Sequence, residues 1–282
     1  MMTTTNQNVI DPVPVELLEM ELTPDRLLRD TNKGGNKIYI IDAFSAPNVM
    51  REVGRLREIA FRAAGGGTGK DCDIDEFDTM EPPCRQLVVW DPEAREIIGG
   101  YRFIPGNEIK MRSDGMPRIA TSHMFSFSER FLKDYLPHTI ELGRSFVRLE
   151  YQTTRVGVKA LYALDNLWDG LGALTVIYPD MRYLFGKVTM YPSYNADCRN
   201  MILYFLTKHF PDPDRLVWPM TPLTTHMDNE AMRKLFIHDT FKDDYKILNK
   251  AIRDHGYNIP PLVNAYMSLS PSMRMFGTAI ND

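Results

Sequence analysis

Three adjacent segments in the middle of the chain decide its fold class. They read TIELGRSFVR at residues 139–148, VKALYALDNLWDGLGALTVIY at residues 158–178 and YLFGKVTM at residues 183–190. The first and third are short and contain β-branched and aromatic residues, which favours strands. The second is longer, and its apolar residues have the spacing of a helix. Strands that alternate with a long helix indicate an α/β fold.

The same patterns continue towards the N-terminus. The segments KIYIIDAF at residues 37–44, QLVVW at residues 86–90 and IIGGYRFI at residues 97–104 predict three further strands, of which the last two form a hairpin. Residues 48–63 have helical spacing, and the Gly-rich and then acidic residues 64–83 predict a loop. Strands and helices in this order predict a mixed central sheet with helices on both faces.

The C-terminal third is predicted to be mainly helical. A helix is expected at residues 197–210, and the highly charged residues 229–255 are expected to be helical before a final strand at residues 262–269. Residues 1–35 contain polar Thr and Asn residues, Pro and Gly, which predicts a loose lead-in with one short helix at residues 17–28. Because no linker divides the remainder, we expect a single domain over residues 36–282.

Composition and charge exclude several classes of protein. Of the 282 residues 44% are hydrophobic, which excludes a disordered chain, and the 33 Lys and Arg against 37 Asp and Glu argue against a general nucleic-acid binder. The three cysteines are too few and too irregularly spaced for a disulfide framework or a metal site, and they fit a reducing compartment. The sequence shows neither a signal peptide nor a membrane-spanning run, so we expect a cytoplasmic location.

Four carboxylates lie within six consecutive residues of the predicted loop. They belong to Asp73, Asp75, Glu76 and Asp78, and they repel one another unless a cation or solvent relieves the charge. Their spacing is not that of an EF-hand, and nothing else in the sequence supports a magnesium site. Spacing alone favours a solvated acidic turn, whereas the apolar Phe77 among these residues indicates a loop that is anchored to the protein.

The segment 139–148 carries two opposite charges inside an otherwise apolar strand. Alternation places Glu141 and Gly143 on one face, and Leu142 and Arg144 on the other, while Gly143 permits close backbone approach or a bulge. Burying either charge alone is costly, so Glu141 and Arg144 are each either paired or functional. A structural ion pair at the end of a strand and a functional site both fit this pattern.

Other cations are candidates to pair with the acidic loop. Arg102 lies inside an apolar strand, and Arg57 and Arg62 flank Phe61 in the predicted helix, although a helical arginine such as Arg62 is usually solvated.

Residues 152–157 precede the long helix, whose N-terminus favours anions; Arg155 and Lys159 would add positive charge there.

Five motifs occur in an order that resembles one family. They are REIAFR at 57–62, DIDEFD at 73–78, GYR at 100–102, ELGRSFV at 141–147 and YLFG at 183–186. The chain resembles the acyltransferases of the GNAT superfamily that make lyso-ornithine lipid or N-acylglycine, some of which carry the label hemolysin. It is more distantly similar to acyl-homoserine-lactone synthases. The closing segments PPLVNAY at 260–266 and Phe276-Gly277 resemble the same lipid acyltransferases, and the resemblance leads us to expect further residues beyond Asp282.

This resemblance implies a GNAT-like fold and an N-acyltransferase. The acyl thioester would lie in a V-shaped gap between the strands at residues 139–148 and 183–190. Its long-chain fatty acyl group, with or without a 3-hydroxyl, would come from the phosphopantetheine of acyl carrier protein. The acceptor would be the α-amine of glycine or ornithine, as in aminolipid biosynthesis. The resemblance implies no metal or redox cofactor, and peripheral contact with the inner membrane.

The resemblance also implies roles for individual residues. Glu141 is expected to be the general base. Arg144 is expected to orient Glu141 or the acidic loop, or to bind the acceptor carboxylate. The remaining expected substrate-site residues are Arg57, Phe61, Asp73, Asp75, Asp78, Arg102, Ser145 and Phe146, in which the three aspartates pair with Arg57 and Arg102.

The expected contact with the carrier protein is a basic surface at the mouth of the gap. Its residues are Arg148, Arg155, Gly157, Lys159 and Lys187. Arg155 replaces the first glycine of the superfamily's coenzyme A loop, which suits a carrier-protein donor. The alternatives are an acyltransferase that uses acyl coenzyme A on another amine or a lysolipid, a lactone synthase, and a non-catalytic membrane-active protein.

Overall fold

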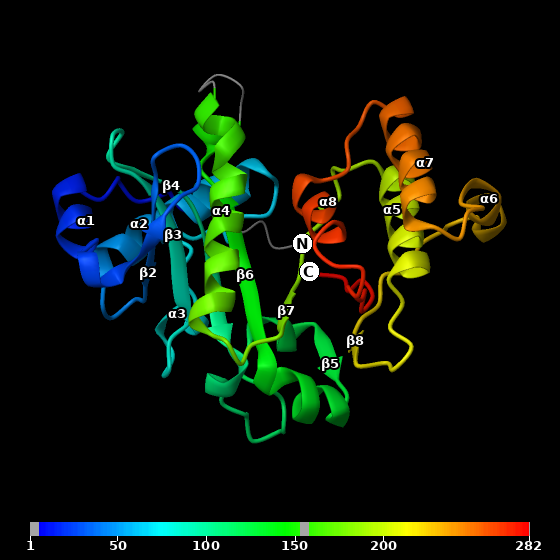
Figure 1. Cartoon of the computed structure of the whole chain (residues 1–282), viewed down its shortest axis with the longest axis horizontal. Helices are drawn as coiled ribbons and strands as arrows, with labels where there is room; N and C mark the ends of the chain where they lie inside the picture. Colours follow the sequence, from blue (N-terminus) through cyan, green and yellow to red (C-terminus); the bar gives the residue numbers. More distant parts are fainter. Residues whose placement is uncertain (1–5, 153–157, 282) are drawn as a thin grey trace. The chain divides into compact units, whose positions relative to one another are not determined.

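The computed structural model of the chain describes residues 6–152 and 158–281 (Figure 1). By its internal contacts the chain divides into two compact units, where the sequence predicted one domain over residues 36–282. The first unit comprises Met1–Ala120 and Asp134–Lys187, and the second comprises Thr121–Lys133 and Val188–Asp282.

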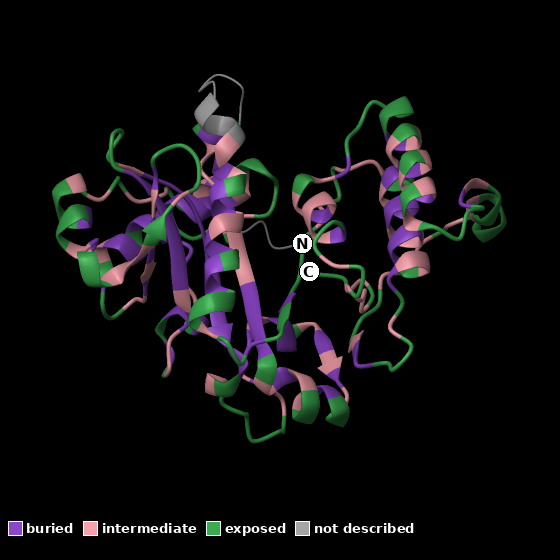
Figure 2. Ribbon diagram, in the orientation of Figure 1, coloured by how far each residue is buried: buried purple, intermediate pink, exposed green. Residues whose placement is uncertain are grey.

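A six-stranded sheet forms the centre of the first unit. Its strands, in spatial order, are β1 (Leu27–Asp30), β2 (Lys37–Ile41), β3 (Arg85–Asp91), β4 (Glu96–Pro105), β6 (Thr139–Val147) and β7 (Tyr183–Gly186). Neighbouring strands are antiparallel except β6 and β7, which are parallel. The central strands are almost wholly buried (Figure 2).

Helices cover both faces of this sheet. The helices of the unit are α1 (Val15–Glu21), α2 (Pro47–Ala63), α3 (Glu76–Thr79) and α4 (Val158–Ile177). Helices α2 and α4 lie on opposite faces of the sheet (Figure 1). Val88 of β3 shares a core cluster with residues of α2, whereas its neighbour Leu87 lies against Gly170 of α4. A Cβ at Gly170 would lie 2.5 Å from Leu87 Cδ1, so this glycine sets how closely α4 approaches the sheet. The predicted mixed α/β sheet with helices on both faces is confirmed.

The N-terminal residues are more ordered than the sequence predicted. Residues 15–30, expected as part of a loose lead-in, form α1, a 3₁₀ turn and β1. Strand β1 pairs with β2, and Leu18 of α1 is buried in the core beside α2. The error arises because the apolar residues of such short elements are too few to show a period.

The second unit is mainly helical. Its helices are α5 (Ala196–His209), α6 (Asn229–Leu235), α7 (Phe241–Asp254) and α8 (Pro261–Met267), and its strands β5 (Phe125–Phe127) and β8 (Val217–Pro219) pair antiparallel. Phe205, Phe236 and Leu248 lie at the centre of its core. The strand predicted at residues 262–269 is wrong, because that segment is α8, which begins with Pro261 at the favoured first helical position.

Short turns complete the secondary structure. They are the 3₁₀ turns Pro24–Arg26, Gly106–Glu108, Ala120–His123, Leu136–His138 and Leu149–Gln152 and the π turn Phe131–Tyr135. Among the described residues, no helix combines the length and the apolar character needed to cross a membrane.

Candidate active site

The sheet face that α2 covers brings polar residues of three strands into one row. Gln86 of β3 pairs with Arg102 of β4, which pairs in turn with Gly143 of β6. Paired residues of neighbouring strands point to the same face, so Gln86, Arg102 and Glu141 share the face that carries Val88. This row is the base of a cluster of charged side chains.

Arg57 enters the cluster from the buried side of α2. Its side chain is fully buried, and its Nη1 lies 3.3 Å from both carboxylate oxygens of Asp78. Gln86 accepts a hydrogen bond from Arg57 Nη2 and donates one from Nε2 to Asp78 Oδ1 at 2.9 Å. These mutual hydrogen bonds offset the cost of removing Arg57 and Asp78 from water.

The acidic loop is part of the interior of the protein. Asp75 caps α3 by accepting from the backbone N–H of Phe77 at 2.9 Å, and Asp78 completes the capping box. Arg102 Nη1 donates to Asp75 Oδ1 at 2.6 Å, and the Arg102 guanidinium lies 5.4 Å from the centre of the buried Phe77 ring. Because Asp73 and Asp78 are also buried, the interpretation as a solvated acidic turn is wrong.

Arg144 reaches this cluster through a β-bulge. Gly100 pairs with Phe146 and Arg102 pairs with Gly143, so β6 has one residue more than β4 in this interval. Arg144 has a φ of +50°, which turns its side chain towards Asp73 and Asp75, whose oxygens each lie 3.2 Å from its Nη2. Simple alternation placed Arg144 on the face opposite Glu141, and the bulge makes that prediction wrong.

The surroundings shift the pKa values of the aspartates in opposite directions. Burial raises the pKa of Asp73, against the attraction of Arg144 and Arg57. Burial also favours the neutral form of Asp75, but the charge of Arg102 and its hydrogen bond outweigh this and hold the pKa of Asp75 well below its usual range. In the described part of the chain, Asp73 Oδ2 has no hydrogen-bond partner.

Glu141 lies on β6 directly before the point where β6 and β7 separate. It is 5% exposed and pairs with Phe185 of β7. The parallel ladder ends one pair later, at Leu142 and Gly186, whereas β6 continues to Val147. The separation of β6 and β7 at this position agrees with the V-shaped gap that the resemblance implied for the thioester.

The other expected substrate-site residues occupy different surroundings. The ring of Phe61 lies 5.9 Å from the guanidinium of Arg144, so it borders the cluster. Ser145 follows the bulge and is half-buried. Phe146 packs into the hydrophobic core beneath α2, with Val88 and Trp90.

The expected carrier-binding residues are only partly described. Arg148 lies 2.5 Å from Glu96 and 3.0 Å from Glu150, so these carboxylates offset its charge. Arg155 and Gly157 lie outside the described residues, as does the side chain of Lys159. Lys187 follows β7 directly and is exposed.

Sequence reasoning missed two buried polar residues. Gln86 was included in an apolar strand, where a single polar letter was the only signal of its role. Glu58 is fully buried and accepts hydrogen bonds from Thr68 and Gly69, which anchors the Gly-rich loop to α2. These bonds, with one from Arg62 at 2.6 Å, lower the pKa of Glu58 although burial raises it. Arg62 is therefore paired, not simply solvated.

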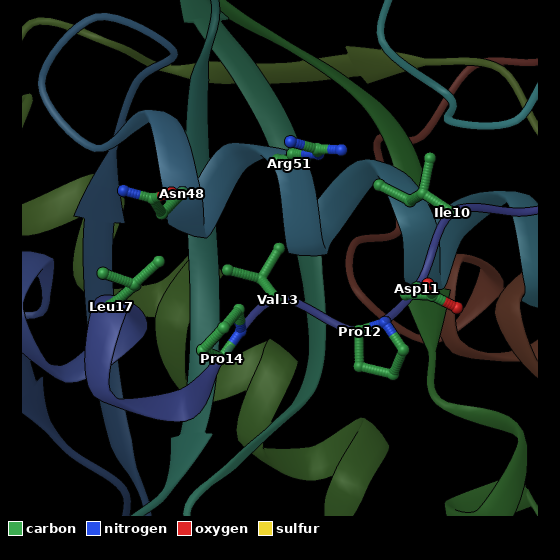
Figure 3. A pocket seen from close by; sticks show the side chains of 8 residues that line it. All are labelled: Ile10, Asp11, Pro12, Val13, Pro14, Leu17, Asn48 and Arg51. Carbon is green, nitrogen blue, oxygen red and sulfur yellow. The ribbon is translucent and has the colours of Figure 1, made fainter.

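A cavity in the described part of the first unit is lined by residues outside the cluster. It measures about 400 Å³ and is formed by residues 10–14 and Leu17 against the start of α2, where Asn48 and Arg51 project (Figure 3). Among the described residues, no group of three or more His, Cys, Asp and Glu side chains is arranged to hold a metal ion.

Comparisons with known proteins agree with the fold. A family model described as an acetyltransferase (GNAT) domain matches residues 56–161. A protein of Bacteroides thetaiotaomicron named glycine N(alpha)-acyltransferase is 67% identical over 275 residues, which are 98% of this chain and 82% of that protein. A protein of Phocaeicola vulgatus with the same name is 64% identical over 275 residues, which are 98% of this chain and 84% of that protein.

Proposed function

The chain belongs to the family of these glycine N(alpha)-acyltransferases and is an N-acyltransferase of the GNAT superfamily, and we propose that its acceptor is glycine. The proposed donor is a long-chain fatty acyl thioester of acyl carrier protein, with or without a 3-hydroxyl on the chain. The names of the two relatives support glycine over ornithine. An N-acylglycine is an aminolipid, so its release gives a reason for peripheral contact with the inner membrane.

The observation that carries this proposal is the position of Glu141. Its buried carboxylate shares a sheet face with Arg102 and lies one pair before the end of the β6–β7 ladder. An acceptor amine that approaches a thioester held between the separating strands therefore meets a carboxylate that can take its proton.

The proposed reaction is direct aminolysis and balances without a metal or redox cofactor. Glu141 removes a proton from the glycine ammonium, and the free amine attacks the thioester carbonyl. Backbone N–H groups of β6 beyond Leu142 would stabilise the oxyanion. The intermediate collapses by breaking the C–S bond, and the proton that the attacking nitrogen loses is taken up by the departing phosphopantetheine sulfur, while Glu141 later releases its own proton to solvent. The products are N-acylglycine and the carrier thiol.

The test compares wild-type protein with Glu141→Gln, which keeps the size of the side chain but removes the base. We expect lipid mass spectrometry of a bacterial host to show N-acylglycine with the wild-type chain. In an assay with purified enzyme and a long-chain fatty acyl thioester of acyl carrier protein, we expect Glu141→Gln to lower kcat by about 100-fold or more, the usual contribution of a general base.

Three results would contradict the proposal or part of it. A preference for ornithine in an amino-acid panel would replace the acceptor, and equal activity with acyl coenzyme A would replace the donor. Leakage of liposomes by a folded protein that transfers no acyl group would support the membrane-active alternative. Full activity of Glu141→Gln would keep the enzyme and remove this residue as the base.

A further inference from the structure

Lys187 stands at the point where β6 and β7 separate. It is the first residue after Gly186, whose pair with Leu142 is the last of the parallel ladder. Two residues earlier, Phe185 pairs with Glu141. The Lys187 ammonium donates to the carbonyl oxygen of Ala120 at 3.2 Å.

Lys187 follows Phe185, the partner of Glu141, by two residues, which places it on the face of the sheet that carries Glu141. Its ammonium interacts with Glu141 and Asp75 and is repelled by Arg144 and Arg102. Although Lys187 is an exposed residue, the loss of water around its ammonium, together with the two arginines, lowers its pKa against the opposing effect of Glu141. A further carboxylate beside this ammonium would stabilise its charged form.

The three arginines of the cluster are less accessible than Lys187. Arg57 and Arg102 are buried and donate to the acidic loop and Gln86. The side chain of Arg144 is 31% exposed, and its Nη2 lies between Asp73 and Asp75. Lys187 is therefore the most exposed of these four cations.

Glycine is so short that its two charged ends must bind close together. Its amine and its carboxylate are attached to the same carbon, so an amine beside Glu141 holds the carboxylate within a few bonds of that residue. A carboxylate that loses water at a partly buried site needs a cationic partner. Lys187 is the exposed cation next to Glu141 in the described part of the cluster.

We propose that Lys187 binds the carboxylate of the acceptor amino acid while Glu141 receives the proton of its amine. This inference rests on the proposed function and adds a residue that selects for an acceptor with a free carboxylate. It differs from the expectation that Lys187 belongs to a carrier-binding surface.

The test measures glycine against glycinamide, which keeps the amine and lacks the carboxylate. We expect Lys187→Met to raise the KM for glycine by about 10- to 100-fold, the scale of a lost charge-assisted hydrogen bond, with little change for glycinamide. The KM for acyl carrier protein and the kcat should stay close to wild type. Lys187→Arg should restore part of the preference, and the exposed Lys110→Met is a matched control that should leave it unchanged.

Several outcomes would overturn the inference. An equal effect of Lys187→Met on glycine and glycinamide would show that the carboxylate is not its ligand. A raised KM for the carrier protein alone would return Lys187 to the donor surface. If Lys187→Met lowers the unfolding temperature, Lys187→Gln, which keeps a polar side chain, replaces it in the same comparison. Equilibrium dialysis with radiolabelled glycine separates the two proposals: a wild-type chain that neither binds nor acylates glycine refutes both.

Discussion

Arg57, Asp78 and Gln86 share one buried set of hydrogen bonds, and each depends on the other two. All three are at most 1% exposed, so none can turn to water when a partner is lost. Removing Arg57 or Asp78 leaves the other charge buried without its ion-pair partner, and removing Gln86 takes a hydrogen-bond partner from both. At the scale of single residues, the cluster therefore controls stability as well as the shape of the site.

The first consequence concerns Asp78. We expect Asp78→Asn to lower the free energy of unfolding by about 3–5 kcal/mol, because the buried Arg57 then loses its ion-pair partner. Urea unfolding followed by circular dichroism measures this change. Its neighbour Glu76, exposed on the same short helix, provides the control: Glu76→Gln should stay within about 0.5 kcal/mol of wild type. Equal effects of the two changes would show that the Arg57 pair is not needed for stability.

The second consequence concerns the dependence of stability on pH. The folded-state pKa of Asp75 lies below its unfolded value, so its contribution is present above the unfolded pKa of about 4 and is lost as the pH falls through the folded value. The free energy of unfolding of the wild-type protein should therefore begin to fall near the unfolded pKa, and the fall should be measurable between about pH 5 and pH 3. In Asp75→Asn this loss should be smaller, as measured by urea midpoints across that range.

Asp11 is exposed, so Asp11→Asn is the control for the loss of stability at acid pH. If Asp75→Asn and Asp11→Asn changed the pH dependence equally, the pKa of Asp75 would not be the cause.

At the scale of elements, the spacing of α4 from the sheet depends on one glycine. Gly170 faces Leu87 with no room for a methyl group, whereas Gly172, two residues later in the same helix, has open space. We expect Gly170→Ala to destabilise the protein by about 1–3 kcal/mol through overpacking. Gly172→Ala should stabilise it by about 0.5–1 kcal/mol, because alanine favours a helix. Thermal and urea unfolding should show changes of opposite sign in the free energy of unfolding of the two variants. Changes of the same sign would refute this packing argument.

Elements with a long and regular apolar pattern were predictable from the sequence. Strands β3, β4 and β6 and helix α2 lie where the sequence predicted them, since each has enough residues to show its period. Helix α8 was mistaken for a strand because seven mostly apolar residues fit either structure. Gly143 indicated that a bulge was possible, but the sequence could not show that it turns Arg144, because that depends on the pairing between β4 and β6.

The candidate site was predictable only in part, for related reasons. The motifs identified Arg57, Asp78 and Arg102, which the structure brings together. They did not identify Gln86, whose importance comes from its register opposite Arg102. A residue whose role depends on a tertiary contact cannot be recognised from a single sequence. A charged residue inside an apolar strand can be, because its burial requires a partner.

At the scale of the whole molecule, the first unit is assembled from segments that are distant in the sequence. Its residues before Ala120 and after Asp134 are interrupted by a segment of the second unit. Sequence patterns describe residues that are close along the chain and cannot show such an interruption. The sequence analysis therefore did not predict two units.

The bond between Arg144 and Asp75 joins residues that are 69 positions apart. During synthesis from the N-terminus, the acidic loop leaves the ribosome well before β6 exists. Asp73 and Asp75 cannot bond to Arg144 until β6 has been made and has paired with β4. Contacts of such separation slow folding. The cluster that shapes the site is therefore completed only after a newly made chain has extended through residues 139–147.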